Sequence, residues 1–237
     1  MIDSLPDVSA QIQECYRIWA EFHPGKEKKL STGFESSGSS ENSPDFNREP
    51  ERSSLFANYS VVSVADGAVQ RDLEEWTEVA ARNIEQAQTL LPEDPLRGRI
   101  LSNARLLSTL CEDILFDPES FRGVRDNGGN LQAAAIVGDM SDHLYLYDII
   151  TAPWNVVRTS PKSVRDAGKT LMLELVKESI SSGYEGRIML NALPGAISFY
   201  EEAGFVFTGE GSQGAPEMEL TPLAAREFFR RYNPSCR

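Results

Sequence analysis

The sequence predicts an α/β fold, in which helices cover both faces of one central sheet. From about residue 58 onward, segments with the β-branched content of strands intermingle with amphipathic helices, and the two kinds of element are not segregated. The chain has 237 residues, 41% of them hydrophobic, which is enough for one substantial core and a smaller appendage.

The appendage is expected at the N-terminus. Residues 8–23 place apolar side chains at helical spacing and predict a short amphipathic helix. Residues 31–54 contain eight serines and only two large apolar side chains, too few to offset the entropy of ordering. We therefore predict a helix and a flexible linker over residues 1–57, and the folded domain over residues 58–237.

The first half of the domain reads as one strand, two helices and three strands. The strand covers 59–66, and Asp66 is placed to cap the first helix, over 68–91. The second helix runs from Pro95 to about Pro118. The turn signal in "DNGG", residues 126–129, then separates two strands of a hairpin, and a third strand covers 143–151.

The second half reads as a helix, a strand, a short helix, two strands and a last helix. The first helix covers 167–182 and is closed by Gly183. A strand covers 186–193, and a short helix begins at Pro194 and stops at Gly204. "FVFTG" and "EMEL" are strands joined by a loose "EGSQGAP" loop, and residues 222–232 form the C-terminal helix.

Composition excludes several classes of partner. The formal net charge is −13 and the pI about 4.7, so binding to nucleic acid or to an anionic membrane is opposed. Three widely spaced cysteines and two histidines offer neither a disulfide framework nor a metal site. No apolar run reaches membrane-spanning length and no signal-peptide pattern is found, so we expect a cytoplasmic protein.

The stretch "SVRDAGKT", residues 163–170, has the chemistry of a phosphate-binding loop. Gly168, Lys169 and Thr170 match the end of the nucleotide-binding P-loop, but Ser163 stands where that motif needs its first glycine. Residues 158–169 carry four basic side chains against one acidic one, in an otherwise acidic chain. The stretch is therefore either an anion-binding helix start or an ordinary solvated one.

Two motifs give the chain a resemblance to the GNAT acetyltransferase superfamily. Arg165, Gly168 and Thr170 occupy the fixed places of the family's [RQ]-x-x-G-x-[GA] loop, and "FYEEAGF", residues 199–205, matches its later signature. The resemblance covers residues 58 to 237. It implies a mixed, mostly antiparallel sheet, acetyl-coenzyme A (acetyl-CoA) as acyl donor without a metal, and an amine of a small molecule or protein as acceptor. A monomer or homodimer is expected.

The resemblance also implies which residues hold the donor. The loop that opens the helix would bind the pyrophosphate through consecutive backbone amides: Arg165, Asp166, Ala167, Gly168, Lys169 and Thr170. Thr170 departs from the family pattern, and its side chain could either crowd the phosphate or donate its hydroxyl to it. Asn191 would contact the pantetheine arm or serve the fold.

Catalytic roles follow from the same resemblance. Tyr200 would protonate the departing thiolate, unless it is simply a core tyrosine, and a backbone amide at Ile150 or Thr151 would bind the carbonyl oxygen. Asp148 is the candidate base, because Leu146 and Ile150 flank it along one face of a strand and should desolvate it, although neighbouring polar groups could satisfy it instead.

The segment "TAPWN" resembles the strand end of some bacterial GNAT proteins. Trp154 and Asn155 would then line the rim on the acceptor side, or else form a turn with a packed tryptophan. Two functions stay open at this point. The chain is an acyl-CoA-dependent N-acetyltransferase, or it is an acyl-CoA-binding regulatory or interaction module without turnover.

Overall fold

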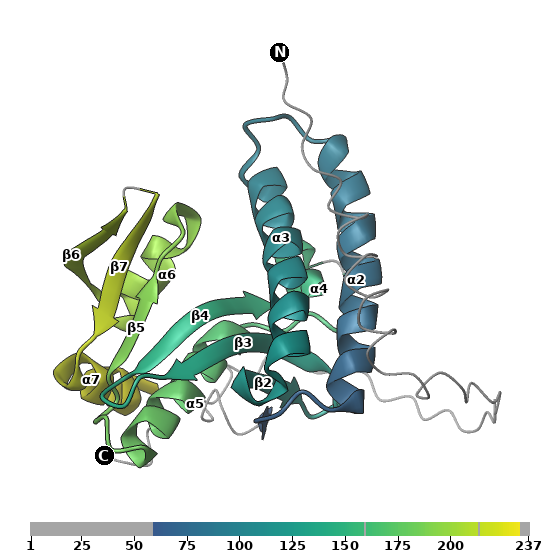
Figure 1. Cartoon of the computed structure of the whole chain (residues 1–237). Helices are drawn as coiled ribbons and strands as arrows, with labels where there is room; N and C mark the ends of the chain where they lie inside the picture. The colour runs from purple at the N-terminus through teal and green to yellow at the C-terminus, as the bar shows by residue number, and fades with distance from the viewer. Residues whose placement is uncertain (1–58, 159, 213, 233–237) are drawn as a thin grey trace, which may run out of the picture.

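The computed structural model describes residues 59–158, 160–212 and 214–232. The helix and linker predicted within residues 1–57 lie outside this range. Figure 1 shows a curved sheet with a long pair of antiparallel helices on one side and shorter helices on the other. This is the α/β architecture that the sequence predicted.

The elements follow one another almost as predicted. The first half contains β1 (Tyr59–Val62), α2 (Gly67–Gln88), α3 (Pro95–Phe116), a 3₁₀ turn (Pro118–Ser120), β2 (Phe121–Asp126), β3 (Leu131–Asp139) and β4 (Leu144–Thr151). The second half contains α4 (Pro153–Val157), α5 (Ala167–Ser181), β5 (Ile188–Asn191), a 3₁₀ turn (Pro194–Ala196), α6 (Ile197–Ala203), β6 (Val206–Ser212), β7 (Ala215–Leu220) and α7 (Pro222–Tyr232).

Local signals set several of these boundaries. The Asp66 carboxylate accepts hydrogen bonds from the amides of Ala68 and Val69, at 2.9 and 3.0 Å, and so caps α2 as predicted. Gly183 and Gly204 follow α5 and α6 with φ of +89° and +101°, a conformation that glycine adopts without strain.

Two segments differ from the prediction. Residues 153–157 form α4, where a turn was expected, because Pro153 suits the first helical position. The loop expected between the last two strands is mostly strand, since β6 extends to Ser212 and β7 begins at Ala215. Gly209 and Gly211 lie at φ of +90° and +88°, where the pairing of β6 with β7 changes register. Gly211, predicted in the loop, is therefore part of a bulge, together with Gly209 of the predicted strand.

The sheet has seven strands in the order β1-β2-β3-β4-β5-β7-β6. Every neighbouring pair is antiparallel except β4 and β5, which run parallel. The sheet is thus mixed and mostly antiparallel, as the family resemblance implied.

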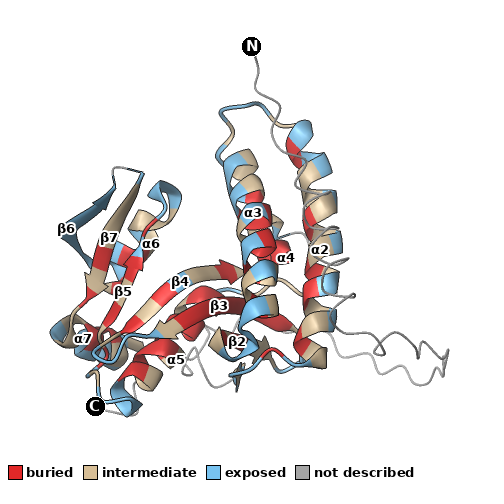
Figure 2. Cartoon of the chain, viewed as in Figure 1, coloured by how far each residue is buried: buried red, intermediate tan, exposed pale blue. Residues whose placement is uncertain are grey.

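Two apolar cores lie on opposite faces of this sheet, and Figure 2 shows buried residues concentrated in the strands and on the helix faces that meet them. One core packs α5, α6 and α7 against the sheet and includes Leu146 and Tyr200. The other packs α2, α3 and α4 against the opposite face and includes Trp76, Ile150 and Trp154. Strand β4 contributes to both cores.

A β-bulge divides β4. Ile136 of β3 pairs with Asp148, but the next residue, Val137, pairs with Leu146, so Tyr147 is an extra residue. The bulge reverses the alternation of side chains, and this corrects one prediction: Leu146 and Ile150 do not flank Asp148 on one face, because they belong to opposite cores. Pairing of β4 with β5 covers only Leu144, Tyr145 and Leu146, so the two strands separate at the bulge.

Within the described ranges, no helix is both long enough and apolar enough to cross a membrane.

Candidate active site

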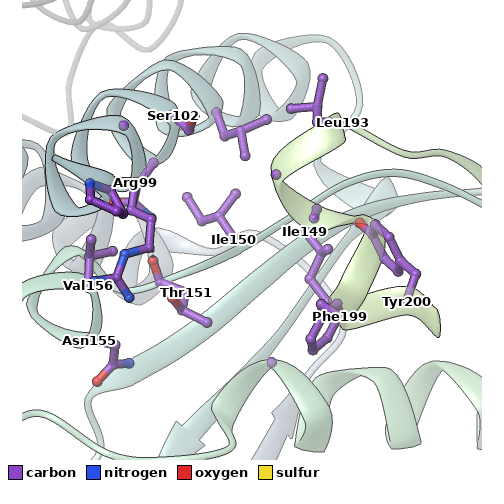
Figure 3. Close-up of a pocket in the computed structure, with 17 residues that line it drawn as sticks. Arg99, Ser102, Ile149, Ile150, Thr151, Asn155, Val156, Leu193, Phe199 and Tyr200 are labelled. Atoms are coloured by element: carbon purple, nitrogen blue, oxygen red, sulfur yellow. Dashed lines mark hydrogen bonds between the residues drawn. The ribbon is translucent and has the colours of Figure 1, made fainter. Parts of the chain in front are cut away.

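A cavity of about 580 Å³ lies beside the second half of β4, beyond the point where β5 leaves it. Its walls come from α3, from the end of β4 with α4, from the first turn of α5, and from α6 with the loop before it (Figure 3). The lining residues are Pro95, Gly98, Arg99, Ser102, Asn103, Leu106, Ile149, Ile150, Thr151, Asn155, Val156, Gly168, Leu193, Gly195, Ala196, Phe199 and Tyr200.

Tyr200 is the polar group most deeply set in this wall. Its side chain is 7% exposed and packs against the rings of Phe199 and Phe205, with centroids 5.3 and 5.5 Å away. Figure 3 shows its hydroxyl directed into the cavity, and no hydrogen bond from it to another described residue is found. Burial, and then the negative charge of Asp148, raise the pKa of this phenol, so it stays protonated at neutral pH.

Asp148 lies near Tyr200 but does not line the cavity. Burial raises the pKa of its carboxyl to about 6, and the charge of Asp113 on α3 adds to the shift. The pKa of Asp113 is raised too, by burial and then by Glu112. The desolvation predicted for Asp148 is therefore present, and α3 supplies part of its surroundings.

The end of β4 has no strand partner among the described residues on its open edge, which leaves a backbone amide there for a ligand. The amide of Ala152 donates to Gln132 of β3, and neighbouring residues of a strand direct their N–H groups to opposite edges. Thr151 therefore faces the open edge, and its carbonyl oxygen accepts a hydrogen bond from the Asn103 side chain at 2.9 Å. Of the two amides predicted to bind a carbonyl oxygen, this geometry favours Thr151 over Ile150.

The first turn of α5 carries uncapped backbone donors. Asp166 precedes the helix in a left-handed conformation, with φ of +63°, and its side chain makes no capping hydrogen bond. The first amides of a helix lack partners within it, so the amides that open α5 are available to an anion. A Cβ added to Gly168 would lie 3.5 Å from Thr151 Cγ2 and 3.6 Å from Phe199 Cζ, in ordinary van der Waals contact, so these two side chains flank the first turn of α5.

In this structure the Thr170 side chain neither crowds the place predicted for the phosphate nor offers its hydroxyl to it. Its side chain is 1% exposed, and its hydroxyl donates to the carbonyl oxygen of Asp166 at 3.1 Å. The bond ties the first turn of α5 to its N-cap residue, which makes Thr170 a support of the loop conformation.

The basic stretch before α5 is partly neutralised by acids from other elements. Lys169 forms an ion pair with Glu202 of α6 at 2.7 Å, which raises the pKa of the lysine and lowers that of the glutamate. Lys162 pairs with Glu75 of α2. Arg165 is exposed and makes no ion pair with another described residue, so it keeps its charge available for a ligand.

Trp154 is not at the rim of the cavity. Its side chain is 3% exposed and packs edge-on against Trp76, with centroids 6.2 Å apart. The prediction that it lines the acceptor side is therefore corrected in favour of a packed tryptophan, because Pro153 starts a helical turn that directs the indole into the core. Asn155 does line the cavity.

Gln132, which was not predicted as a site residue, holds this region together. It is fully buried on β3, and its amide nitrogen donates to Asp126 at 2.6 Å and to the Lys162 carbonyl at 3.0 Å. Its amide oxygen accepts from the side chains of Trp154 and Asn155, both at 3.0 Å. A polar residue in a run of small apolar ones was the available signal.

Asn191 ends β5 and is exposed, and it is not among the residues that line the cavity. Its contact with the donor stays a prediction. No group of three or more potential metal ligands comes together in the described part of the chain.

Comparison with known proteins adds a likeness of fold. No family model matches the sequence, and no curated protein matches it significantly. The chain is similar in fold to N-acetyltransferases. One solved structure, the PaiA N-acetyltransferase of Thermoplasma acidophilum in complex with coenzyme A, has 18% identity and a TM-score of 0.42, and covers 69% of this chain and 98% of its own.

Two further solved structures carry similar descriptions. The ribosomal-protein-S18-alanine N-acetyltransferase of Escherichia coli has 20% identity and a TM-score of 0.38, and covers 68% of this chain and 92% of its own. A GNAT-family acetyltransferase of Listeria monocytogenes has 15% identity and a TM-score of 0.39, and covers 68% and 94% of the two chains.

Proposed function

We propose that this protein is an acyl-CoA-dependent N-acetyltransferase that transfers an acetyl group to the amine of a small molecule or protein. The observation that carries the proposal is the Tyr200 hydroxyl, which is held by a buried side chain, has no hydrogen-bonding partner among the described residues and points into the cavity. The hydroxyl is open to the cavity and is not among the buried polar atoms of the described residues that lack a partner, so it is free to donate a hydrogen bond to a ligand bound there.

The walls of the cavity fit the donor in three places. The uncapped first turn of α5 and the free charge of Arg165 suit a pyrophosphate. The gap beyond Leu146, where β4 has no strand on one edge, suits an extended arm that takes the place of the missing strand. Ile149, Leu193 and Phe199 offer an apolar lining for its methylene groups. The donor supplies an activated acetyl thioester.

Three groups of the chain would each perform one task in the transfer of the acetyl group. The amide of Thr151 would stabilise negative charge on the carbonyl oxygen as the amine attacks. Asp148, with a pKa of about 6, is ionised at neutral pH and would collect the amine proton through water. Tyr200 is protonated at neutral pH and would donate this proton to the leaving thiolate.

The alternative is a module that binds acyl-CoA without turnover. Two observations favour it: Asp148 does not line the cavity, and Lys162 and Lys169 are engaged by glutamates. Release of free thiol from acetyl-CoA in the presence of a panel of amines distinguishes the two functions. Amine-dependent release supports the enzyme, whereas calorimetric binding of coenzyme A without any release supports the module.

A further inference from the structure

The only charged side chain among the 17 residues that line the cavity is that of Arg99. The whole chain carries a net charge of −13, so a lone cation in this cavity has the opposite sign to the overall charge. Polar side chains near Arg99 are neutral: Ser102 and Asn103 follow it on α3 at the i+3 and i+4 positions and share its face of the helix.

Arg99 keeps its charge free. It is exposed, and none of the ion pairs found in the described ranges includes it. The helix offers it no carboxylate, because positions 95, 96, 102 and 103, three and four residues away, are Pro, Leu, Ser and Asn. Figure 3 shows the side chain extending from α3 into the cavity on the side of Thr151. An unpaired guanidinium in such a place is suited to bind a carboxylate or phosphate.

The position of α3 in the fold decides between these two anions. The first turn of α5, where we place the donor phosphates, belongs to the core on one face of the sheet, and α3 belongs to the core on the other. β4 ends between them: the Thr151 carbonyl accepts a hydrogen bond from Asn103 of α3, and the Thr151 side chain lies next to Gly168 of α5, 3.5 Å from where a Cβ of that residue would be. Arg99 therefore faces the part of the cavity left for the acceptor.

We infer that the acceptor carries an anionic group, a carboxylate, and that Arg99 binds it and so selects amino acids or peptide-like acceptors over simple amines. This inference rests on the proposed transferase function and names its acceptor class. The net negative charge of the chain alone would suggest a cationic acceptor. The charged side chain that lines the cavity is positive, however, so an anionic group on the acceptor fits it better.

The test compares amino acids with their amides as acceptors, in wild-type protein and in Arg99→Gln. We expect kcat/KM for the acid, relative to its amide, to fall by about tenfold or more in Arg99→Gln, since a charge-assisted contact is lost. Using this ratio cancels the different basicity of the two amines. Arg105→Gln is the matched control, because Arg105 is also exposed on α3 but does not line the cavity.

Calorimetry with coenzyme A separates the two sources of anion. The dissociation constant for coenzyme A should be the same in wild type, Arg99→Gln and Arg105→Gln. A tenfold weaker affinity for coenzyme A in Arg99→Gln alone, with an unchanged ratio of acid to amide, would assign Arg99 to the donor phosphates and overturn the inference.

Two further outcomes distinguish this inference from the proposed function. Turnover of amines with the same ratio of acid to amide in wild type and Arg99→Gln would overturn the inference and leave the transferase standing. If no amine releases thiol, the proposed function fails, and direct titration of amino acids and amides still tests Arg99: preferential binding of the acid that Arg99→Gln abolishes supports the carboxylate site, and equal binding contradicts it.

Discussion

The two halves of β4 have different neighbours and different tasks. From Leu144 to Leu146 the strand is paired on both edges, with β3 and β5, and both leucines are at most 3% exposed. From Asp148 to Thr151 it keeps only β3, and Ile149, Ile150 and Thr151 line the cavity. One strand can therefore anchor the core where its backbone hydrogen bonds are complete and offer backbone groups to a ligand where they are not.

Removing the Tyr200 hydroxyl should have the largest effect and should act only on the open half. In Tyr200→Phe we expect kcat to fall by about 10² to 10⁴, because general-acid assistance is lost, with little change in the Michaelis constant for acetyl-CoA. Thermal unfolding should be nearly unchanged, since no described residue bonds to the hydroxyl. If Tyr200→Phe kept near wild-type turnover on a substrate for which chemistry limits the rate, Tyr200 would not be the general acid and would serve only in packing.

Shortening Leu146 should act on the closed half. Leu146 is 1% exposed in the core with α5, so Leu146→Ala should lower the free energy of unfolding by about 2–5 kcal/mol. Tyr147→Ala, one residue away on the bulge and 50% exposed, is the control and should cost far less. If denaturant unfolding gave equal losses of unfolding free energy for the two variants, the closed half of β4 would not be the anchor of the core.

Arg165 and Lys169 lie in the loop and first turn of α5 that face the open half of β4, and they should differ in how much they contribute to coenzyme A binding. Arg165→Glu should weaken coenzyme A binding by about tenfold or more, because attraction to phosphate becomes repulsion. Lys169→Gln should weaken it less, since Glu202 already engages that lysine. Calorimetry at low and moderate salt measures both, and an unchanged affinity in Arg165→Glu would remove this loop from the site.

We expect the smallest effect from Asp148, which lies next to the bulge of β4: a dependence of stability on pH. Its carboxyl has a pKa of about 6 in the folded protein, above the value of 3.8 for an unperturbed aspartate. The folded state therefore holds this proton more tightly, and its contribution to stability is present below about pH 4 and lost as the pH rises to about 6. After a discount for partial solvation the loss is about 1–2 kcal/mol.

Asp148→Asn should remove this contribution, so the difference in unfolding free energy between pH 4 and pH 7 should shift by that amount relative to wild type. The rise of kcat/KM with pH up to about 6 should vanish with it if Asp148 is the base. Identical pH profiles of wild type and variant, in both stability and rate, would show that Asp148 is ionised without penalty.

The order of elements could be predicted from the sequence because short-range signals set it. Asp66, Gly183 and Gly204 act on their own helix ends, and apolar periodicity shows which face is buried. The bulge at Tyr147 could not be predicted, because it depends on the pairing of β4 with β3 and not on either strand alone.

The candidate site divides in the same way. Tyr200, Thr151 and Gly168 were found from motifs and do line one cavity. The pairing of Lys162 and Lys169 with glutamates was missed, because Glu75 and Glu202 are distant in the sequence. Arg99 was missed as well, since an arginine on a helix is usually solvated and only the packing of α3 over β4 shows its place in the cavity.

The hydrogen bonds of Gln132 have a consequence for the kinetics of ligand binding. They join the β2–β3 turn, α4 and the segment before α5, where Ser163 donates to the Trp154 carbonyl at 2.7 Å and the Val164 amide to Asn155 at 2.8 Å. Residues 160–165 are thereby tethered to the sheet and to α4. Little conformational entropy remains to be lost when an anion docks there, so association should proceed in one kinetic phase without a slow ordering step.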